Sequence, residues 1–453
     1  MPDKSSSVFP AFSSRLGFIL AAIGAAVGLG NVWRFPYEAG ENGGGAFVLI
    51  YLIGMVLVAA PIFLCEALIG RRGRGSPPTA LLRQAVEHGR SRAWRIPGLL
   101  GVIGALVLMS FYSVIAGWSL HYMLGAGAGH FTGLDADAAQ SYFARLQGSP
   151  QLLLLWQGTF IMATMAIVGL GVNRGIERGM RLMMPLLALL LIGLVVYAFV
   201  AGEGRMALHY LFAPDFSAIT PEVALAAVGQ SLFSVSVGLG GIMMYAAYLP
   251  RGASLPGSAA YVISADTAVA LLAGLAIFPI VFAHGLAPDS GPGLIFITLP
   301  LAFGEMPFGN LVGFAFCFFL FVAALTSSVA LYEPMTAYLG ERGVSRRLGV
   351  AVAASLSWVM GIFSVLSFNL LSDMVITPFQ AITWGLNNLV LPVGALILAY
   401  FAGRLLHREA TVQELGMGDG RLYRGWRLAV RWIAPGFILL LFVSNLLPES
   451  LFS

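Results

Sequence analysis

Eleven apolar segments, each long enough to cross a lipid bilayer as a helix, follow one another along this chain of 453 residues. A helix needs about 20 predominantly apolar residues to span the hydrocarbon core. Only 10% of the residues are charged, whereas a soluble domain carries about 25%. We therefore predict an all-α polytopic membrane protein whose spans cover residues 13–37, 43–70, 96–125, 152–171, 179–201, 222–249, 258–285, 308–338, 346–368, 376–403 and 425–447.

Arginine is concentrated in alternate loops, and this orients the spans. Seven arginines lie in 71–95, five in 404–427, and three each in 173–181 and 342–347. The intervening loops are acidic and contain Asp135, Asp137, Glu203, Asp215, Asp289, Glu305 and Asp373. Because positive loops stay in the cytoplasm, we expect a multi-pass protein of the bacterial inner (plasma) membrane with a cytoplasmic N-terminus and an external C-terminus. The net charge of +4 then reflects topology, not a nucleic-acid partner.

One short pattern occurs in two spans. Residues 27–30 in the first span and 237–240 in the sixth both read Val-Gly-Leu-Gly. Glycine is common in membrane helices, but a glycine-interrupted span at the same place in two halves is typical of a transporter's binding site. With five spans in each unit, the second unit is inverted relative to the first. We predict a first five-helix inverted repeat over 13–201, a second over 222–403, and an additional transmembrane helix over 425–447.

Polar side chains gather around these two interruptions. Unwound backbone exposes carbonyl oxygens, which are costly in lipid unless a cation uses them, and the amide ends of half-helices favour an anionic carboxylate. Asp266 lies deep in the seventh span, where a carboxylate is a functional candidate by default; a structural ion pair is the alternative, with Arg34 as the one visible partner. Glu66, in the second span, is more easily read as a structural acid. The other polar residues near the interruptions are Asn31, Gln230, Ser234, Ser236, Thr326, Ser327 and Ser328.

Several segments together resemble the neurotransmitter:sodium symporter family, whose bacterial members include LeuT. The most specific is 24–36, Gly-Ala-Ala-Val-Gly-Leu-Gly-Asn-Val-Trp-Arg-Phe-Pro. The others run in order over nearly the whole chain, at 15–20, 41–47, 175–178, 229–236, 296–300 and 325–328. The resemblance implies the LeuT fold, a 5+5 inverted repeat with broken first and sixth helices, here with an eleventh transmembrane helix and no twelfth.

The resemblance also implies ligand sets for Na+ (one or two ions) and for an amino acid. One sodium ion would be held by the Ala26 carbonyl, Asn31, Ser234 and Asp266, and completed by the substrate carboxylate. A second would use carbonyls of Gly24, Val27 and Ala323 with the hydroxyls of Thr326 and Ser327. The substrate would contact Ala26, Gly30, Leu108, Tyr112, Phe233, Ser236, Leu239, Ser327 and Leu331.

Three local features refine the expected substrate and ions. Gly28 occupies the position where monoamine carriers of this family have an aspartate, so the substrate must bring its own carboxylate. The leucines at 108, 239 and 331 favour a neutral, hydrophobic side chain. Asp266 stands where chloride-dependent relatives have a neutral residue, so we predict no chloride requirement.

The gates are less regular. Relatives pair the residue corresponding to Arg34 with an acid in the tenth span, where this chain has Gln380 and Thr383; Tyr112 and Phe233 would close over the ligand. On the inner side Glu341 matches the gate acid and Tyr248 its neighbour, while Lys4 would replace an arginine that the family has near Phe9.

The predicted function is sodium-coupled symport of a neutral, hydrophobic L-amino acid by alternating access. Two alternatives remain open: proton coupling through Asp266, because a buried carboxylate can titrate, and an amino-acid sensor that no longer transports. An enzyme is disfavoured because no metalloprotease or nucleophile-elbow motif occurs. The particular amino acid, the number of ions and the oligomeric state do not follow from the sequence.

Overall fold

We describe the protein from a computed structural model, in which residues 10–250, 252–288 and 293–446 are described. This part of the chain is helical and contains no strand. Nine of its helices are long and apolar enough to cross a membrane, and a bent pair of helices is a tenth. The prediction of a polytopic all-α protein is therefore confirmed. Lys4 and Phe9, which we considered for the inner gate, lie outside the described residues.

The first five predicted spans appear as five helical units. They are α1 (Arg15–Ala26) with η1 (Gly30–Arg34) and α2 (Phe35–Glu41); α3 (Gly45–Gly54) with η2 (Met55–Ala59) and α4 (Ala60–Gly73); η3 (Arg92–Trp94) with α6 (Arg95–Gly127); α8 (Pro150–Gly169); and η4 (Val172–Glu177) with α9 (Arg178–Ala201).

The remaining spans follow the same order along the chain. They are α11 (Pro221–Ser234) with α12 (Gly241–Ala247); α13 (Leu255–Ala283); α15 (Gly309–Gly340); α16 (Arg346–Leu366); α17 (Pro378–Gly385) with η7 (Leu386–Val390), α18 (Leu391–Tyr400) and η8 (Phe401–Leu405); and α20 (Arg421–Leu428) with η9 (Ala429–Ile433) and α21 (Ala434–Leu446). Shorter connecting elements are α5 (Pro77–Glu87), α7 (Ala136–Gln147), α10 (Gly204–Phe212), η5 (Phe216–Ala218), η6 (Leu294–Thr298), α14 (Leu299–Glu305) and α19 (Arg408–Leu415).

The fifth span begins seven residues earlier than hydropathy predicts, at Val172 and not at residue 179. Hydropathy assigned this stretch to a loop because it is charged. Glu177 is in fact buried, and it accepts hydrogen bonds from the Ser13 amide (2.9 Å) and from Arg181 (2.7 Å). Because the Glu177 carboxylate has hydrogen-bond partners, this charged stretch can form a helical turn in which Glu177 is buried. The hydrogen bond from Ser13 connects the turn to the residues just before α1.

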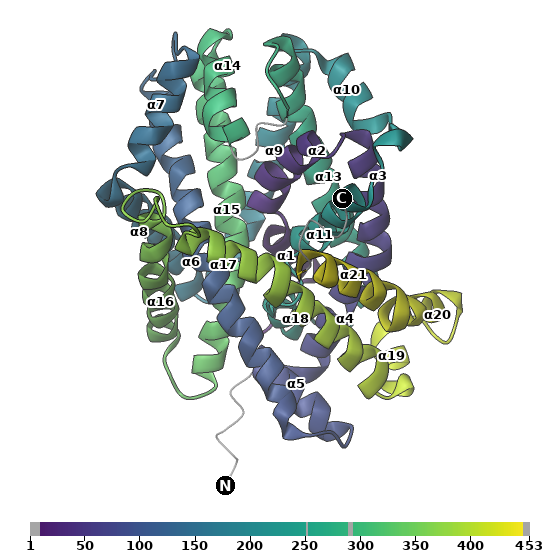
Figure 1. The fold of residues 1–453 in the computed structure, drawn as a ribbon. Coiled ribbons are helices and arrows are strands. Elements are labelled where there is room, and N and C mark those ends of the chain that lie inside the picture. The colour runs from purple at the N-terminus through teal and green to yellow at the C-terminus, as the bar shows by residue number, and fades with distance from the viewer. Residues whose placement is uncertain (1–9, 251, 289–292, 447–453) are drawn as a thin grey trace.

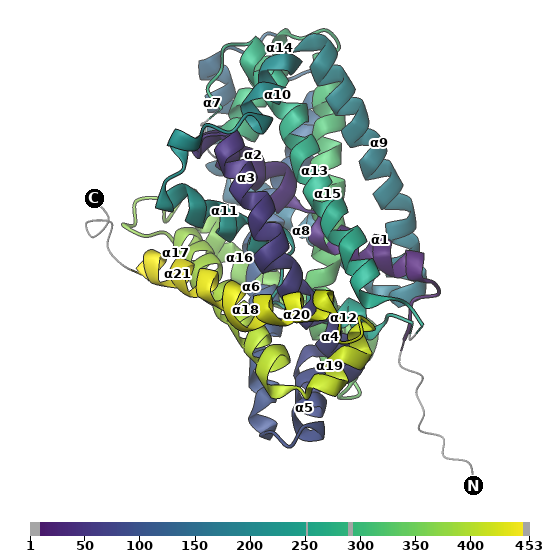
Figure 2. The same cartoon turned by 90° about the vertical axis from the view of Figure 1, so that its right-hand side faces the viewer.

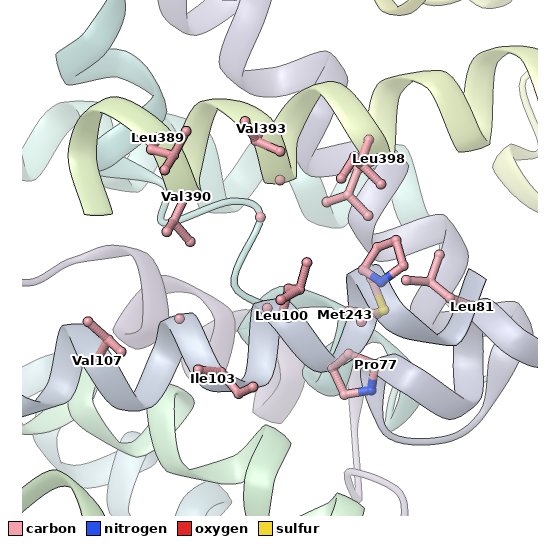
Figure 3. Close-up of a pocket in the computed structure, with 18 residues that line it drawn as sticks. Pro77, Leu81, Leu100, Ile103, Val107, Met243, Leu389, Val390, Val393 and Leu398 are labelled. Carbon is pink, nitrogen blue, oxygen red and sulfur yellow. The ribbon is translucent and has the colours of Figure 1, made fainter. Parts of the chain in front are cut away.

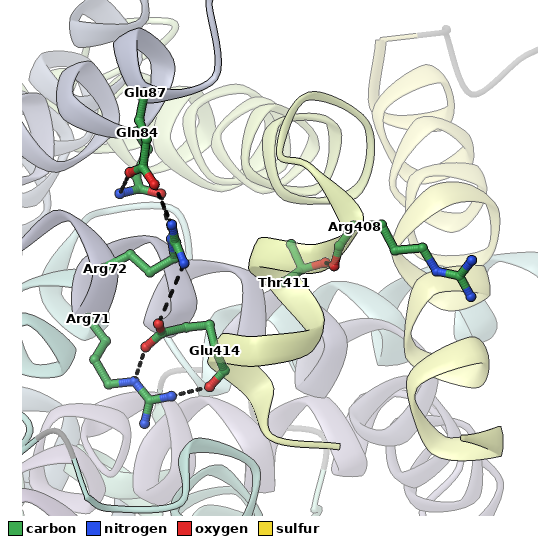
Figure 4. A network of polar contacts seen from close by, with 7 residues as sticks. All are labelled: Arg71, Arg72, Gln84, Glu87, Arg408, Thr411 and Glu414. Carbon is green, nitrogen blue, oxygen red and sulfur yellow. Dashed lines mark hydrogen bonds and ion pairs between the residues drawn. The ribbon is translucent and has the colours of Figure 1, made fainter. Parts of the chain in front are cut away.

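The connecting elements divide between the two ends of the molecule. Figures 1 and 2 both place α5 at one end, and α7, α10 and α14 at the opposite end. The arginine-rich stretch 71–95 includes α5, whereas the opposite end carries acids such as Asp137 and Glu305. At the α5 end, Arg71 and Arg72 join α4 to α5 and α19 through Glu87 and Glu414 (Figure 4).

The centre of the bundle is built around α15. This helix packs against α6, α8, α9 and α16, and also against α1. The helix α1 in turn contacts α9, α12 and α13, so it is enclosed by other helices. In Figure 1, α1 and α11 lie near the middle of the molecule. The first interruption is therefore enclosed by other helices, and unwound backbone is tolerated where it is buried in protein.

Candidate functional site

The first span breaks at the glycine-rich sequence. The helix α1 ends at Ala26, Val27 is extended (φ −69°, ψ 114°), and the axis bends by 51° before Gly30–Glu41. The Asn31 side chain closes the break by accepting a hydrogen bond from the Gly28 amide (3.1 Å). Gly28 needs to lack a side chain, because a Cβ there would lie 2.9 Å from the Tyr112 hydroxyl.

The sixth span breaks as well. The helix α11 ends at Ser234 and α12 begins at Gly241. Three residues between them have positive φ: Ser236 (49°), Gly238 (96°) and Gly240 (84°). Glycine takes these angles without strain, whereas serine rarely does. Both breaks predicted from the Val-Gly-Leu-Gly repeat are thus present.

Glu66 on α4 holds the second break from outside. Its carboxylate accepts hydrogen bonds from the amides of Gly238 (2.7 Å) and Met243 (3.2 Å). The side chain is fully buried. The structural role read from the sequence agrees with this geometry, and the structure adds its partner, which is the unwound backbone itself.

A buried polar cluster joins the two breaks to α13. The Asn31 amide donates to the Asp266 carboxylate (2.8 Å) and to the Ser234 hydroxyl (2.9 Å), and Ser234 donates to the other oxygen of Asp266 (2.5 Å). All three side chains are at most 1% exposed. Tyr51 reaches Ser234 at 3.3 Å, and Gln230 donates to the Gly30 carbonyl (2.9 Å). The three predicted side-chain ligands of the first sodium ion therefore meet at one point.

The hydroxyl pair on α15 faces the first break. Ser327 donates to the carbonyl of Ala25 (3.2 Å), and Thr326 donates to the carbonyl of Ala323 (2.9 Å). A Cβ on Gly24 would lie 3.2 Å from the Cβ of Thr326. The Ala25 carbonyl was absent from our expected set. Hydroxyl and carbonyl oxygens suit a hard alkali cation, and the described residues contain no cluster of His, Cys, Asp or Glu that would hold a transition metal.

The expected substrate residues surround the same breaks. The Tyr112 hydroxyl accepts a hydrogen bond from the Leu29 amide (3.3 Å), and Phe233 would lie 2.9 Å from a Cβ on Gly30. Ser236 donates to the carbonyl of Phe233 (3.4 Å). The apolar members Ala26, Leu108, Leu239 and Leu331 are all buried. Their assignment as substrate contacts, like that of the ion ligands, stays a prediction.

The outer arginine is neutralised within its own helix. Arg34 pairs with Glu38 (3.1 Å) four residues on, and its guanidinium lies 4.5 Å from the centre of the Phe233 ring. In the tenth span, Gln380 and Thr383 make hydrogen bonds within α17 and its cap. Sequence reasoning missed Glu38, although its i, i+4 spacing from Arg34 is a recognisable signal.

On the α5 side the two inner-gate candidates, Tyr248 and Glu341, have partners that the sequence did not predict, and their role in gating stays a prediction. The Tyr248 hydroxyl donates to Glu333 (2.6 Å), and Arg346 pairs with the same carboxylate (2.5 Å). Glu341 instead accepts hydrogen bonds from the amide and hydroxyl of Ser76 (2.7 and 2.6 Å). We missed Glu333, which a search for carboxylates inside apolar spans would have found.

Comparison with known proteins agrees with this architecture. The model of the sodium:neurotransmitter symporter family matches residues 10–131 and 148–450. The chain is 34% identical to the uncharacterized sodium-dependent transporter YhdH of Bacillus subtilis over 96% of this chain and 97% of that protein. It is 26% identical to the sodium-dependent nutrient amino acid transporter 1 of Drosophila erecta, over 78% and 65% of the two chains.

A solved structure matches the fold closely. The crystal structure of MhsT in complex with L-phenylalanine superposes with a TM-score of 0.89 at 40% identity, over 96% of this chain and 99% of that one. MhsT has the LeuT fold, so the predicted fold class is confirmed. This chain belongs to the sodium:neurotransmitter symporter family and is a multi-pass, sodium-dependent membrane transporter, not an enzyme.

Proposed function

We propose that this transporter carries a neutral, hydrophobic L-amino acid into the cell together with sodium, by alternating access and without chloride. The observation that carries the proposal is the meeting of Asn31, Ser234 and Asp266, one from each break and one from α13. Their oxygens lie beside unwound backbone from both halves of the chain. A sodium ion there would take the substrate carboxylate as one of its ligands, so the ion and the substrate would each raise the affinity for the other.

The second ion site in this proposal lies between the first break and α15. Thr326 and Ser327 present hydroxyls there, and carbonyls of Ala25 and Ala323 already accept hydrogen bonds from them. A cation at this position would link α1 to α15. Its binding would therefore favour the conformation in which the two helices are in contact.

Apolar lining and the bound ligand of a relative support the substrate class. Leu108, Leu239 and Leu331 are buried on α6, in the second break and on α15. The MhsT structure contains L-phenylalanine. The glycine at position 28 leaves no carboxylate for an amine substrate, so the substrate supplies its own negative charge.

The chloride prediction depends on Asp266. Its carboxylate lies in the buried cluster, and in its ionised form it would repel a bound anion beside it. We also propose the predicted topology of two inverted repeats, 13–201 and 222–403, with the α5 end and the N-terminus in the cytoplasm. The separation of arginine-rich and acidic ends supports this orientation.

Uptake of labelled L-phenylalanine into proteoliposomes tests the proposal. We expect accumulation under an inward sodium gradient with pH clamped, unchanged when gluconate replaces chloride. Accumulation driven by a pH gradient in potassium would favour proton coupling through Asp266, and binding without accumulation would favour a sensor. Loss of uptake in gluconate would overturn chloride independence alone.

A further inference from the structure

An apolar groove runs between α6 and α18 on the outside of the second break. It has a volume of about 420 Å³, and its lining is almost entirely hydrocarbon. Figure 3 shows Leu100 on α6 and Val390 at the end of η7 pointing into the gap, with Met243 and Pro77 at one end. Gly238 and Gly240 of the second break line it as well. The unwound segment of the sixth span thus forms part of the wall of this groove.

The groove faces the hydrocarbon of the membrane. Both flanking helices belong to membrane spans, and the lining residues Leu100, Ile103 and Leu389 are 53%, 48% and 44% exposed. Water has no polar partners on such a surface, and an empty groove would forfeit dispersion contacts. A lipid acyl chain is the component of the surroundings that fits it.

A basic rim continues from the end of the groove at α5. A second depression there is lined by Leu82, Arg83, Val86, Glu87, Arg92 and Arg95. The two hollows adjoin along the chain: Leu81 and Pro97 line the groove, while Arg83 and Arg95 line the rim. An acyl chain in the groove therefore places its headgroup beside this rim.

Several cations around the rim are already in use, whereas Arg92 and Arg95 are not. Arg71 and Arg72 are paired with Glu414 and Glu87 (Figure 4), and Arg83 donates to the carbonyls of Gly73 and Arg74. The exposed guanidinium groups of Arg92 and Arg95 make neither a hydrogen bond nor an ion pair with any residue in the described part of the chain. They remain available to an anion.

Aromatic residues mark the same level as the membrane interface. Trp94, between these two arginines, packs against Phe401 (4.9 Å between ring centres) and Tyr400 (6.3 Å). Tryptophan and tyrosine are enriched where the hydrocarbon meets the headgroups. Arg92 and Arg95 therefore lie at headgroup depth, directly beyond the apolar groove.

We propose that an anionic membrane phospholipid docks here, with one acyl chain in the α6–α18 groove and its phosphate on Arg92 and Arg95. Lipid tails are as apolar as the side chains they replace, so tail burial alone gives little selectivity. The headgroup charge provides it, as in other basic pockets between membrane helices. Through Gly238, Gly240 and Met243 the lipid would contact the hinge of the sixth span.

Native mass spectrometry of the whole purified transporter tests this assignment without measuring transport. We add dioleoyl-phosphatidylglycerol or the zwitterionic dioleoyl-phosphatidylcholine and measure the fraction of protein that retains lipid. The expected result is one preferentially retained phosphatidylglycerol. Its affinity should fall about thirtyfold in the double variant Arg92→Gln/Arg95→Gln. Val393→Trp, which fills the groove, should also release it.

The matched control removes the same charge elsewhere. Arg421 and Arg424 on α20 are exposed and line neither hollow, so Arg421→Gln/Arg424→Gln should retain phosphatidylglycerol as the wild type does. Equal retention of the two lipids by the wild type would overturn the proposal. So would undiminished phosphatidylglycerol binding in both the rim and the groove variants, or an equal loss in the α20 control.

Discussion

The carboxylate of Glu66 accepts a hydrogen bond from the amide of Gly238 at 2.7 Å, so a side chain of the second span holds the break in the sixth. The other carboxylate oxygen binds the Met243 amide (3.2 Å) beyond the break. One acid thus takes up two amides that no longer have helical partners. This contact explains how unwound backbone is kept inside a membrane protein at a position away from water.

Replacing Glu66 should destabilise the fold in a graded way. Glu66→Ala leaves the Gly238 and Met243 amides unpaired, and the expected loss is about 2–6 kcal/mol, since each such donor costs about 1–3 kcal/mol. Glu66→Gln keeps one acceptor and should lose less. Thermal unfolding of the purified variants in detergent measures both. Unfolding of Glu66→Ala at the wild-type temperature would show that the contact is dispensable.

A methyl group at Gly28 should weaken amino-acid binding. The added Cβ would lie 2.9 Å from the Tyr112 hydroxyl and 3.0 Å from Ser327, so both must move. We expect Gly28→Ala to lower the affinity for L-phenylalanine about tenfold or more, an overpacking cost. Equilibrium binding of the labelled amino acid measures this.

Gly193→Ala is the matched control. Gly193 lies on an exposed face of α9, and a Cβ there meets nothing within 4 Å. Its affinity should equal that of the wild type. An unchanged affinity in Gly28→Ala would mean that the ligand site does not include this corner of the first break.

Neutralising Glu38 should speed the release of substrate. In the proposed mechanism the pair with Arg34 takes the place of a tenth-span acid at the outer gate, and both side chains are mostly shielded, with exposures of 22% and 13%. We expect Glu38→Gln to raise the dissociation rate of bound amino acid about fivefold. Asp373→Asn, in the exposed loop before the tenth span, should leave the rate unchanged. The opposite pattern would move the outer closure to that loop.

Removing the Thr326 hydroxyl should change the number of ions that bind. The plot of log apparent affinity against log sodium concentration should have a slope near two in the wild type, as expected for two linked ions. In Thr326→Ala the slope should fall to about one, because only the site at Asp266 remains. A slope near two in this variant would remove Thr326 from the ion site.

Much of the fold follows from hydropathy, because a membrane leaves helices as the main spanning structure. The start of the fifth span did not follow from hydropathy, because a charged turn is assigned to a loop unless the partners of Glu177 are known. The breaks were predictable from glycine at equivalent positions. Their exact path was not, because the left-handed Ser236 depends on packing around it.

The candidate site was predictable wherever a motif carried it, as for Asn31, Ser234 and Asp266. It was not predictable where a charged residue pairs with a residue of another helix. Glu333 forms an ion pair with Arg346, which hydropathy placed at the edge of the next span. The Tyr248 hydroxyl also donates a hydrogen bond to Glu333. Hydrogen bonds between distant helices are set by tertiary geometry, and no local pattern records them.

Equilibrium binding of L-phenylalanine to the purified protein, in sodium against potassium at one pH, tests the central claim most directly. The claim predicts strong binding in sodium and little in potassium, with Asp266→Asn losing most of the sodium effect. Equal binding in the two salts, or a sodium effect that survives intact in Asp266→Asn, would contradict a shared ion and amino-acid site at the paired breaks.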